Sequence, residues 1–347
     1  MIPLIELAPG YSIPRVILGA WQLSLGHSDL AGDRDTIFST WDRALDHGLN
    51  TFDCADIYTG VEALIGRYIR GRITAGVAPP QVHTKFVPDA AALPTIDRRY
   101  VAQIIDRSLT RLGVEQLDLV QFHWWDYSVA GYRDTVGWLC DLVRVGKIRA
   151  IGLTNFDTAK TRELASLGDP IVATQVQYSM LDQRPARGLD QVADGNRIGL
   201  LCYGTVAGGF LSERWLGAPA PADLENRSLV KYLLVIDDFG GWERFQGLLA
   251  TLDRIARTHG CTIPAVALRW VIDRRAVAAA IVGTRRDGHF DSIEAAFRLH
   301  LSAADRQAIA LATGPDPGPA GDVYTAERCQ GKHSAIMRYD LNNRASD

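Results

Sequence analysis

The chain has 347 residues, of which 47% are hydrophobic and 22% are charged, and its formal net charge at pH 7 is −3. These proportions are those of a globular protein, and the length suits one α/β barrel of about 250 residues or more, or two average domains. The slight negative charge argues against a basic nucleic-acid-binding surface and against a polybasic membrane patch.

The chain shows no sign of secretion or membrane insertion. Its first residues lack a basic segment followed by an apolar run, and no stretch reaches roughly 18 uninterrupted apolar residues. The five cysteines are dispersed and form no C-x-x-C pair, which argues against a disulfide framework or structural zinc. We therefore expect a cytoplasmic protein that has no membrane partner.

The elements begin with Ile2–Leu7, a Pro9-Gly10 turn and Tyr11–Pro14, a pattern that predicts a hairpin outside the main fold. Short apolar runs then alternate with segments of helical period. Their hydrophobicity is continuous, which is typical of parallel strands buried on both faces. The expected strands are Val16–Ala20, Leu49–Asp53, Val82–Phe86, Leu117–His123, Ala150–Thr154, Val172–Gln175, Leu200–Tyr203 and Val277–Val282.

Eight strand-then-helix units with right-handed crossovers predict a (β/α)8 TIM barrel. Glycines follow the expected helix ends at positions 48, 113, 146 and 168, where a C-cap favours positive φ. A doubly wound open sheet is the alternative, but the even repetition without a change of composition favours the closed barrel. We expect a single domain over residues 1–347, with a core over about 14–312.

Two segments interrupt this regularity. The first, from Gly208 to about Gly247, is longer than an ordinary connection and is expected to be a lid or substrate loop. Helical patterns at Phe245–His259 and Pro264–Arg274 then precede the eighth strand. The second segment is the tail over about 313–347, which either drapes over the barrel mouth or is partly disordered.

Four residues with proton-handling side chains lie at or just after strand ends. Asp53, Lys85 and His123 end the second, third and fourth strands, and Tyr58 follows Asp53 by five residues. In a barrel these ends meet at the catalytic face. A lysine ammonium beside Tyr58 would lower the phenol pKa by roughly one or two units. Asp53 would keep Lys85 charged, and neutral His123 would donate a hydrogen bond to a carbonyl oxygen.

These residues carry a family resemblance. The segment Asp53-Cys54-Ala55-Asp56-Ile57-Tyr58, the following Gly60-Val61-Glu62 and Ile65-Gly66, and the strand ends Thr84-Lys85 and Gln121-Phe122-His123 resemble the aldo-keto reductase family. The similarity covers roughly Pro14 to Ala312. It implies that Tyr58 is the general acid of a carbonyl reduction, helped by Lys85 and Asp53, and that His123 orients the carbonyl.

The cofactor segments are expected after the last two strands. No G-x-G occurs in the chain, so a standard Rossmann fingerprint is absent. Barrels often bind phosphates at the loops after strands seven and eight. Gly204, Thr205 and Gly208 follow strand seven, and small residues there allow backbone N–H groups to approach a pyrophosphate. Val282–Arg286 follows strand eight, before a helix expected near Phe290–Phe297.

The resemblance implies roles for individual cofactor residues. Thr154, Asn155 and Gln175 match positions that hold the nicotinamide carboxamide, and Tyr203 matches the aromatic residue on which the ring stacks. The residues that the resemblance places at the adenosine phosphate are Gly283, Thr284, Arg286 and His289. His289, Ser292 and Ile293 differ from the residues common in relatives, so NADP(H) is expected and NAD(H) is possible.

Aromatic residues near the strand ends are expected to form the substrate pocket. Trp21 ends the first strand and Trp124 follows His123, so with Tyr58 they would enclose a small-molecule carbonyl substrate. Trp125 is expected to serve packing instead. No fixed arginine for an anionic substrate is evident near His123.

Three functions fit these observations. The leading one is an NADPH-dependent reduction of aldehydes or ketones to alcohols by hydride transfer. A redox-sensing regulatory subunit that binds the cofactor and turns over slowly is the alternative. A lyase using Lys85 as a Schiff-base nucleophile is less favoured, because Asp53 would keep the amine charged. No H-x-H or comparable metal-ligand cluster occurs, and the sequence leaves the oligomeric state open.

Overall fold

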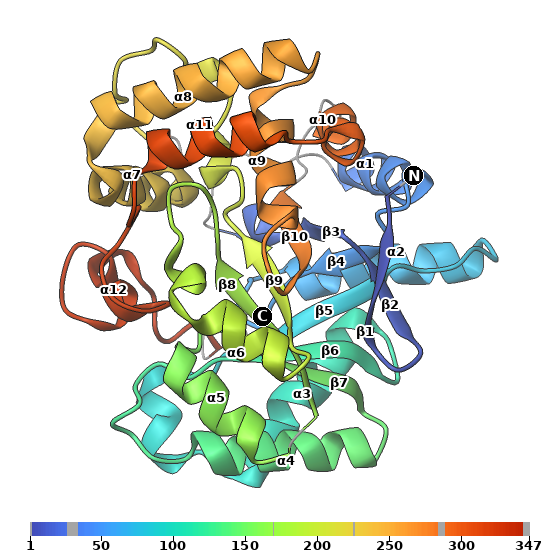
Figure 1. Cartoon of the computed structure of the whole chain (residues 1–347). Coiled ribbons are helices and arrows are strands. Elements are labelled where there is room, and N and C mark those ends of the chain that lie inside the picture. The colour runs from blue at the N-terminus through green and yellow to red at the C-terminus, as the bar shows by residue number, and fades with distance from the viewer. Residues whose placement is uncertain (1, 26–33, 169, 225, 284–288, 343–347) are drawn as a thin grey trace.

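In the computed structural model, the described residues are 2–25, 34–168, 170–224, 226–283 and 289–342. Eight parallel strands form a closed barrel in the order β10-β3-β4-β5-β6-β7-β8-β9 (Figure 1). The strands are β3 (Val16–Gly19), β4 (Thr51–Asp53), β5 (Gln81–Phe86), β6 (Leu117–Phe122), β7 (Ile148–Thr154), β8 (Ile171–Gln177), β9 (Gly199–Tyr203) and β10 (Val277–Gly283). The expected barrel is confirmed, and the open sheet is excluded because β10 pairs with β3.

Helices surround the barrel and connect its strands. They are α1 (Arg34–Asp46), α2 (Val61–Thr74), α3 (Arg98–Leu112), α4 (Tyr132–Arg144), α5 (Thr158–Ser166), α6 (Leu189–Gly195), α8 (Gly241–Thr258), α9 (Ile263–Ile272), α10 (His289–Arg298) and α11 (Ala303–Thr313). Short 3-10 turns are η1 (Trp21–Leu23), η2 (Ala90–Thr95), η3 (Arg184–Arg187), η4 (Ala207–Gly209), η5 (Glu213–Trp215) and η6 (Ser334–Ile336).

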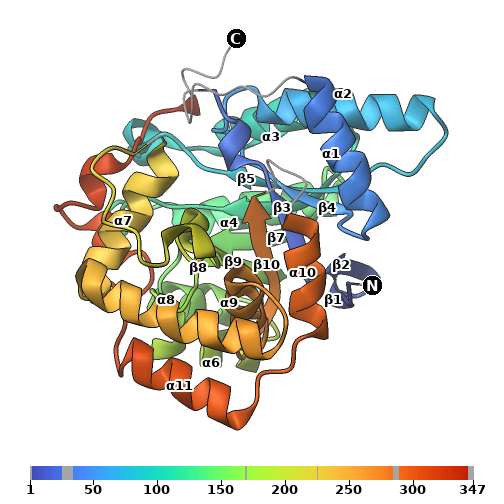
Figure 2. The same ribbon diagram turned by 90° about the horizontal axis from the view of Figure 1, so that it is seen from above.

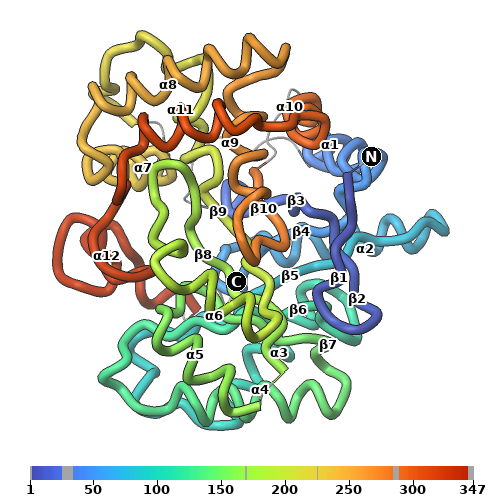
Figure 3. The backbone as a smooth tube through the Cα atoms, in the orientation of Figure 1, coloured from blue at the N-terminus to red at the C-terminus, as the bar shows by residue number. Residues whose placement is uncertain are grey.

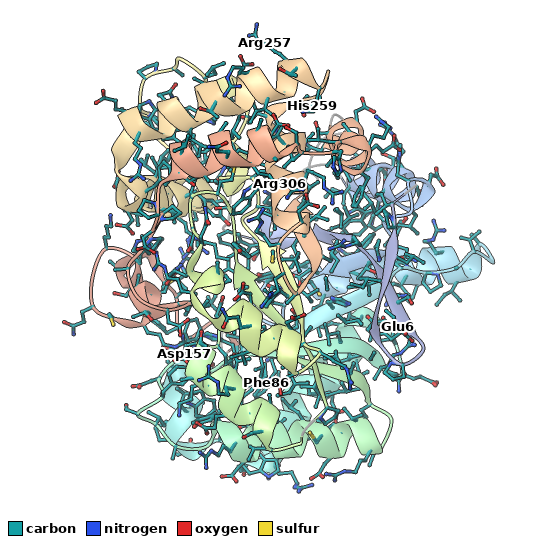
Figure 4. The ribbon with its side chains drawn as sticks, in the orientation of Figure 1. Glu6, Phe86, Asp157, Arg257, His259 and Arg306 are labelled. Atoms are coloured by element: carbon teal, nitrogen blue, oxygen red, sulfur yellow. The ribbon has the colours of Figure 1, made fainter. Side chains whose placement is uncertain are left out.

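Capping residues set the ends of several helices. Asp97 caps α3 by accepting a hydrogen bond from the Tyr100 backbone N–H, and α3 ends at Gly113 with φ of 69°. Asp157 likewise caps α5 by accepting from the Lys160 N–H at 2.7 Å (Figure 4). Such caps satisfy backbone groups that the helix itself leaves unpaired. In the described part of the chain, no helix combines the length and the apolar character needed to cross a bilayer.

A hairpin of β1 (Leu4–Ala8) and β2 (Tyr11–Pro14) packs against the barrel interior, as expected for an element outside the barrel. Leu7, Tyr11 and Ile13 are buried with apolar side chains from the barrel strands, including Leu119 and Leu201. The Tyr11 hydroxyl also lies 2.8 Å from His83 Nε2, inside the barrel. The hairpin therefore leaves the carboxyl ends of the strands as the accessible end.

His83 makes the stability of this region depend on pH. Burial lowers the pKa of His83 to about 4, below its ordinary value of 6.5. The unfolded chain binds a proton at this histidine below pH 6.5 and the folded chain does not, so His83 destabilises the fold as the pH falls from 6.5 toward 4. Relative to the wild type, we expect His83→Gln to gain about 2 kcal/mol of unfolding free energy between pH 7 and pH 5. Urea unfolding at both pH values measures this difference, and an equal offset at both would contradict it.

The segment after β9 is more ordered than a lid loop. It contains η4, η5 and the helix α7 (Arg227–Phe239), and α8 starts at Gly241 rather than near Phe245. The expectation of a long loop is therefore wrong for residues 227–247. Asn226 caps α7 by accepting from the Leu229 N–H, and apolar residues at helical spacing, such as Leu229, Tyr232 and Ile236, are buried.

The described part of the tail, through residue 342, drapes over the barrel mouth. It runs from α11 past α7 to the short helix α12 (Thr325–Arg328), as the tube in Figure 3 shows. Figures 1 and 2 both place α7 and α12 on the same side of the barrel. At the far end, the Asn342 side chain donates to Asp56 Oδ2 and to the Val87 carbonyl, while its backbone N–H donates to Asp89 Oδ1.

One buried ion cluster fastens the tail to the loop after β8. Arg184 donates to both oxygens of Asp182 and, through Nη1 and Nη2, to both oxygens of Glu327 in α12 at 2.9 and 3.1 Å. All three side chains are at most 3% exposed. This contact joins residues 143 positions apart in the chain.

Candidate active site

Lys85 and Asp53 form a buried ion pair at the carboxyl ends of two neighbouring strands. Lys85 Nζ lies 2.7 Å from Asp53 Oδ1 and 2.8 Å from the Cys54 carbonyl oxygen. Asp53 Oδ2 accepts hydrogen bonds from the Gln121 and Gln175 side-chain amides at 2.8 and 2.6 Å. The carboxylate is therefore held by one ammonium and two amides, and it is not available as a base.

The network keeps Lys85 charged. Burial alone would lower the pKa of Lys85, but the charge of Asp53, with Tyr58 and the hydrogen bond to Asp53, outweighs it and raises the pKa above 10.5. A charged amine is not a nucleophile, so this geometry argues against Schiff-base chemistry. Gln121 was missed as a member of the site. The sequence feature that could have indicated it is a polar side chain inside an otherwise apolar strand, two positions before His123.

Tyr58 lies over this ion pair. Lys85 Nζ is 5.2 Å from the centre of the Tyr58 ring, and both residues line the same cavity. Burial raises the pKa of Tyr58 to about 12, and the Lys85 ammonium offsets only part of that increase. Lys85 lowers the phenol pKa in the expected direction, but the net shift is upward, because burial penalises the phenolate more than one cation stabilises it. At neutral pH Tyr58 is therefore a protonated hydrogen-bond donor.

His123 is fixed in one neutral form. Its Nδ1 lies 3.0 Å from the Thr154 carbonyl oxygen, and its Nε2 is buried without a partner. Edge-on contacts with the Trp125 and Tyr324 rings, at 4.3 and 5.5 Å between centroids, hold the imidazole in place. Burial, followed by the nearby Arg328 charge, lowers the pKa of His123 to about 3.

This arrangement bears on the expectation that His123 donates a hydrogen bond to the substrate. A carbonyl oxygen only accepts hydrogen bonds, so the single proton of the neutral ring belongs to Nδ1. Nε2 then carries a lone pair and accepts a hydrogen bond rather than donating one. The sequence could not show which ring nitrogen meets the backbone of the neighbouring strand.

A cavity of about 830 Å³ opens above these residues. All four members of the expected catalytic set line it, and so does Trp21. Most of the expected cofactor residues line it as well, namely Thr154, Asn155, Gln175, Tyr203, Gly204, Thr205, Gly208, Gly283 and His289. Thr284 and Arg286 lie outside the described residues.

The donors and acceptors in this cavity fit a nicotinamide. The Tyr203 hydroxyl donates to Asn155 Oδ1 at 2.9 Å, which leaves the Asn155 amide N–H groups as donors. Gln175 uses its amide nitrogen toward Asp53 and Gln121, so its oxygen remains an acceptor. Asn155 also has a positive φ of 60°, a conformation that concentrates at functional sites. One free donor and one free acceptor match a carboxamide.

The turn after β9 fits a phosphate. A Cβ at Gly204 would lie 2.6 Å from the Tyr232 hydroxyl oxygen, and one at Gly208 would lie 2.7 Å from the Tyr232 ring. Both glycines also have positive φ, so larger residues would be strained there. The Thr205 hydroxyl is buried without a partner in the same turn. Backbone and hydroxyl groups are thereby available at the cavity wall.

The tryptophans after His123 have the opposite roles to those expected. Trp124 is fully buried and does not line the cavity; its indole N–H donates to the Asp126 and Val129 carbonyl oxygens. Trp125 lines the cavity and packs against His123. Trp124 is therefore wrong as a substrate residue. Side chains alternate along an extended segment, so the residue two positions after an inward-facing histidine returns to the same face.

The tail supplies residues that sequence reasoning missed. Tyr324 lines the cavity with a positive φ of 61° and places its ring edge against His123. Arg328 donates to the Trp124 and Asn155 carbonyl oxygens at 3.0 and 2.8 Å. The sequence offers little indication of these contacts, because hydrophobic residues in the tail do not recur at a helical or strand period. In the residues that are described, no group of three or more His, Cys, Asp or Glu side chains could hold a metal ion.

A closed parallel barrel with titratable side chains gathered at its carboxyl face is the arrangement of TIM-barrel enzymes. Similarity to known proteins identifies the family within this class of enzymes. A model of the Aldo/keto reductase family matches residues 15–312, and the chain belongs to this family. Membership implies an oxidoreductase that uses a nicotinamide cofactor to reduce small carbonyl compounds.

Individual relatives are distant. Flagellar radial spoke protein 5 of Chlamydomonas reinhardtii is 32% identical over 263 residues, 63% of this chain, and the match spans about half (49%) of that protein. Aldo-keto reductase YhdN of Bacillus subtilis is 24% identical over 86% of this chain and 90% of its own. A crystal structure of a thermostable aldo-keto reductase with the inhibitor epalrestat superimposes with a TM-score of 0.70 at 25% identity, covering 90% of this chain and all of that one.

Proposed function

We propose that the protein is an NADPH-dependent reductase of aldehydes or ketones, with Tyr58 as the general acid. The observation that carries the proposal is the Lys85–Asp53 ion pair directly below the Tyr58 phenol, at the floor of the cavity. Asn155 and Gln175 would hold the nicotinamide carboxamide, and the Gly204–Gly209 turn would hold phosphate. The bound nicotinamide would supply the hydride.

The chain's own residues would manage the proton. Tyr58 donates a hydrogen bond to the carbonyl oxygen and transfers its proton as negative charge develops on that oxygen. With a pKa of about 12 the Tyr58 phenol is protonated at neutral pH, yet it is a stronger acid than the alcohol that forms, and the Lys85 ammonium stabilises the resulting phenolate. The phenolate then regains a proton from solvent. Asp53 acts only by keeping Lys85 charged and in position.

His123 would bind the alcohol product rather than polarise the carbonyl of the substrate. Its Nε2 lone pair can accept a hydrogen bond from the hydroxyl of the alcohol, or from a hydroxyl next to the carbonyl in the substrate. Trp125 and Tyr324 prevent the ring from turning away. This role replaces the donation to the carbonyl oxygen that the resemblance implied.

The experiment is a paired measurement of binding and turnover. Quenching of intrinsic fluorescence by NADPH and by NADH would give the two dissociation constants, with NADPH expected to bind more tightly. Absorbance at the reduced nicotinamide band would then follow oxidation in the presence of reactive aldehydes and ketones. Binding without oxidation by any member of a broad panel would overturn the reductase proposal.

A regulatory subunit is the second candidate. The relative with 32% identity is named as a flagellar radial spoke protein rather than as an enzyme. Tight cofactor binding with negligible reduction of every carbonyl compound would favour this role. Borohydride trapping of a carbonyl substrate on Lys85 would instead support the lyase, against which the raised pKa of Lys85 argues.

A further inference from the structure

The cavity carries cationic side chains that the proposed chemistry does not use. Lys231 and Arg227 line it from α7, and Arg338 lines it from the tail. The only carboxylate among the described lining residues is Asp53, which is already paired with Lys85. Within the described ranges, none of the three cations has a carboxylate within ion-pair distance. A cation in an enclosed site without a counter-ion is costly, so such a site favours an anionic ligand.

Arg227 is linked both to Lys231, on the same helix, and to Arg338, in the tail. Arg227 and Lys231 are four residues apart on α7 and therefore share one helix face, where two like charges are unfavourable. Arg227 also donates to the Ile336 carbonyl oxygen at 2.8 Å, which joins α7 to the tail segment that carries Arg338. Burial, with a smaller contribution from Arg338, lowers the pKa of Arg227. Arg227 and Arg338 therefore repel each other, and Lys231 lies one helical turn further along α7.

Lys231 is the most enclosed of the three cations. Its Nζ lies 4.5 Å from the Tyr203 ring centroid and 5.6 Å from that of Tyr232. Burial lowers the pKa of Lys231 to about 8, although the charge of Glu327 opposes that decrease. Glu327 does not neutralise Lys231 directly, because both of its oxygens accept hydrogen bonds from Arg184.

The tail links the three cations to the reacting groups. Helix α7 packs against the Gly204–Gly209 turn through Ser228 and Tyr232, so Arg227 and Lys231 lie on a helix next to the turn that fits a phosphate. The tail that carries Arg338 also places Tyr324 against His123. Arg227 donates to the same tail, so the three cations extend from the phosphate turn toward the side of the cavity that holds His123.

We propose that the natural substrate is a carbonyl compound bearing a carboxylate or a phosphate, which Lys231, Arg227 and Arg338 bind. This inference rests on the proposed reductase function and specifies its substrate class. The sequence shows no fixed arginine near His123 for an anionic substrate, and the proposed cations are not sequence neighbours of that histidine. The cations come from a helix and a tail that are remote in the sequence from His123.

The test compares matched substrates with and without the charge. Succinate semialdehyde is compared with butanal, and glyceraldehyde 3-phosphate with glyceraldehyde, each with NADPH. We expect kcat/KM to be at least about tenfold higher for a charged member, mainly through KM, and the pair with the larger ratio identifies carboxylate or phosphate as the group. The ratio should fall about tenfold in Lys231→Met. It should not change in Lys332→Met, because Lys332 is an exposed tail lysine outside the cavity that pairs with Asp238.

Two results would overturn the inference. One is a wild-type ratio near one for both pairs. The other is a Lys231→Met variant that weakens NADPH binding by the same factor as it weakens use of the charged substrate, which would assign Lys231 to the cofactor. Reduction of the neutral aldehydes without any charge preference would leave the reductase function intact and remove only this inference.

A binding measurement keeps the inference testable even if no carbonyl compound is reduced. Succinate or inorganic phosphate is added to the NADPH complex, and the thermal midpoint is recorded. We expect either anion to stabilise the wild-type complex by mass action and to have no effect on Lys231→Met. Arg338→Gln should reduce the shift, and because Arg338 is exposed, this variant does not disturb the core. Absence of any shift in the wild type would overturn the inference.

Discussion

Tyr58→Phe is expected to lower kcat by roughly 10²–10⁴-fold, the usual contribution of a positioned general acid. The substitution removes one hydroxyl from the ring above Lys85 and leaves the packing of that ring intact. NADPH affinity should stay within about twofold, because the residues proposed to hold the cofactor are unchanged. Single-turnover oxidation of NADPH, together with a fluorescence titration, separates the chemical step from binding.

Tyr324 provides the comparison for this result. It is a second tyrosine in the same cavity, and its pKa is likewise raised by burial, but it contacts His123 rather than Lys85. Full activity in Tyr58→Phe, together with loss of turnover in Tyr324→Phe, would transfer the acid role to the tail. Full activity in both variants would remove the tyrosine mechanism altogether.

Arg184→Met is expected to reduce the free energy of unfolding by about 3–5 kcal/mol. The variant leaves Asp182 and Glu327 buried without their shared cation, and burial of an unpaired carboxylate is far more costly than loss of a surface ion pair. The released tail should also expose the cavity, so KM should rise. Urea unfolding monitored by tryptophan fluorescence measures the first effect, and steady-state kinetics with a reactive aldehyde measures the second.

A surface arginine gives the matched control. Arg257 on α8 pairs with Asp253 at 2.8 Å, but its side chain is 78% exposed (Figure 4). Arg257→Met should therefore change the unfolding free energy by less than about 1 kcal/mol. The triple variant Asp182→Asn, Arg184→Met, Glu327→Gln should recover much of the loss, because it removes the unpaired charges as well. Equal losses in Arg184→Met and Arg257→Met would show that the buried cluster does not hold the tail.

The barrel could be predicted because its strands are continuous apolar runs, which are easy to recognise in the sequence. A parallel strand buried on both faces must be apolar along its whole length, so runs such as Leu117–His123 and Val277–Val282 differ from the helices around them. The observed strands agree with the expected ones to within two residues at each end. The shared position of the proposed catalytic residues followed from the same logic, because Asp53, Lys85 and His123 are polar residues at the ends of these runs.

Other parts of the site depend on contacts between distant residues. Trp124 and Trp125 are equally aromatic, and only the direction of each side chain shows that Trp125 faces the cavity. The helix α7 was hidden by neighbouring glycines and prolines, although its apolar residues recur at helical spacing. The direction of the Tyr58 pKa shift depended on how completely the phenol is buried, which no local pattern expresses.

The sequence by itself determined the closed barrel, the family and the four proton-handling residues, because these depend on the period of apolar residues and on their chain order. Only the tertiary structure decided which contacts those residues make. It set His123 Nδ1 against the Thr154 carbonyl oxygen, joined Asp53 to Gln121 and Gln175, and brought Lys231 and the tail to the wall of the cavity. Each of these features is a contact between chain segments far apart in the sequence, and its energy depends on distance and burial rather than on local pattern.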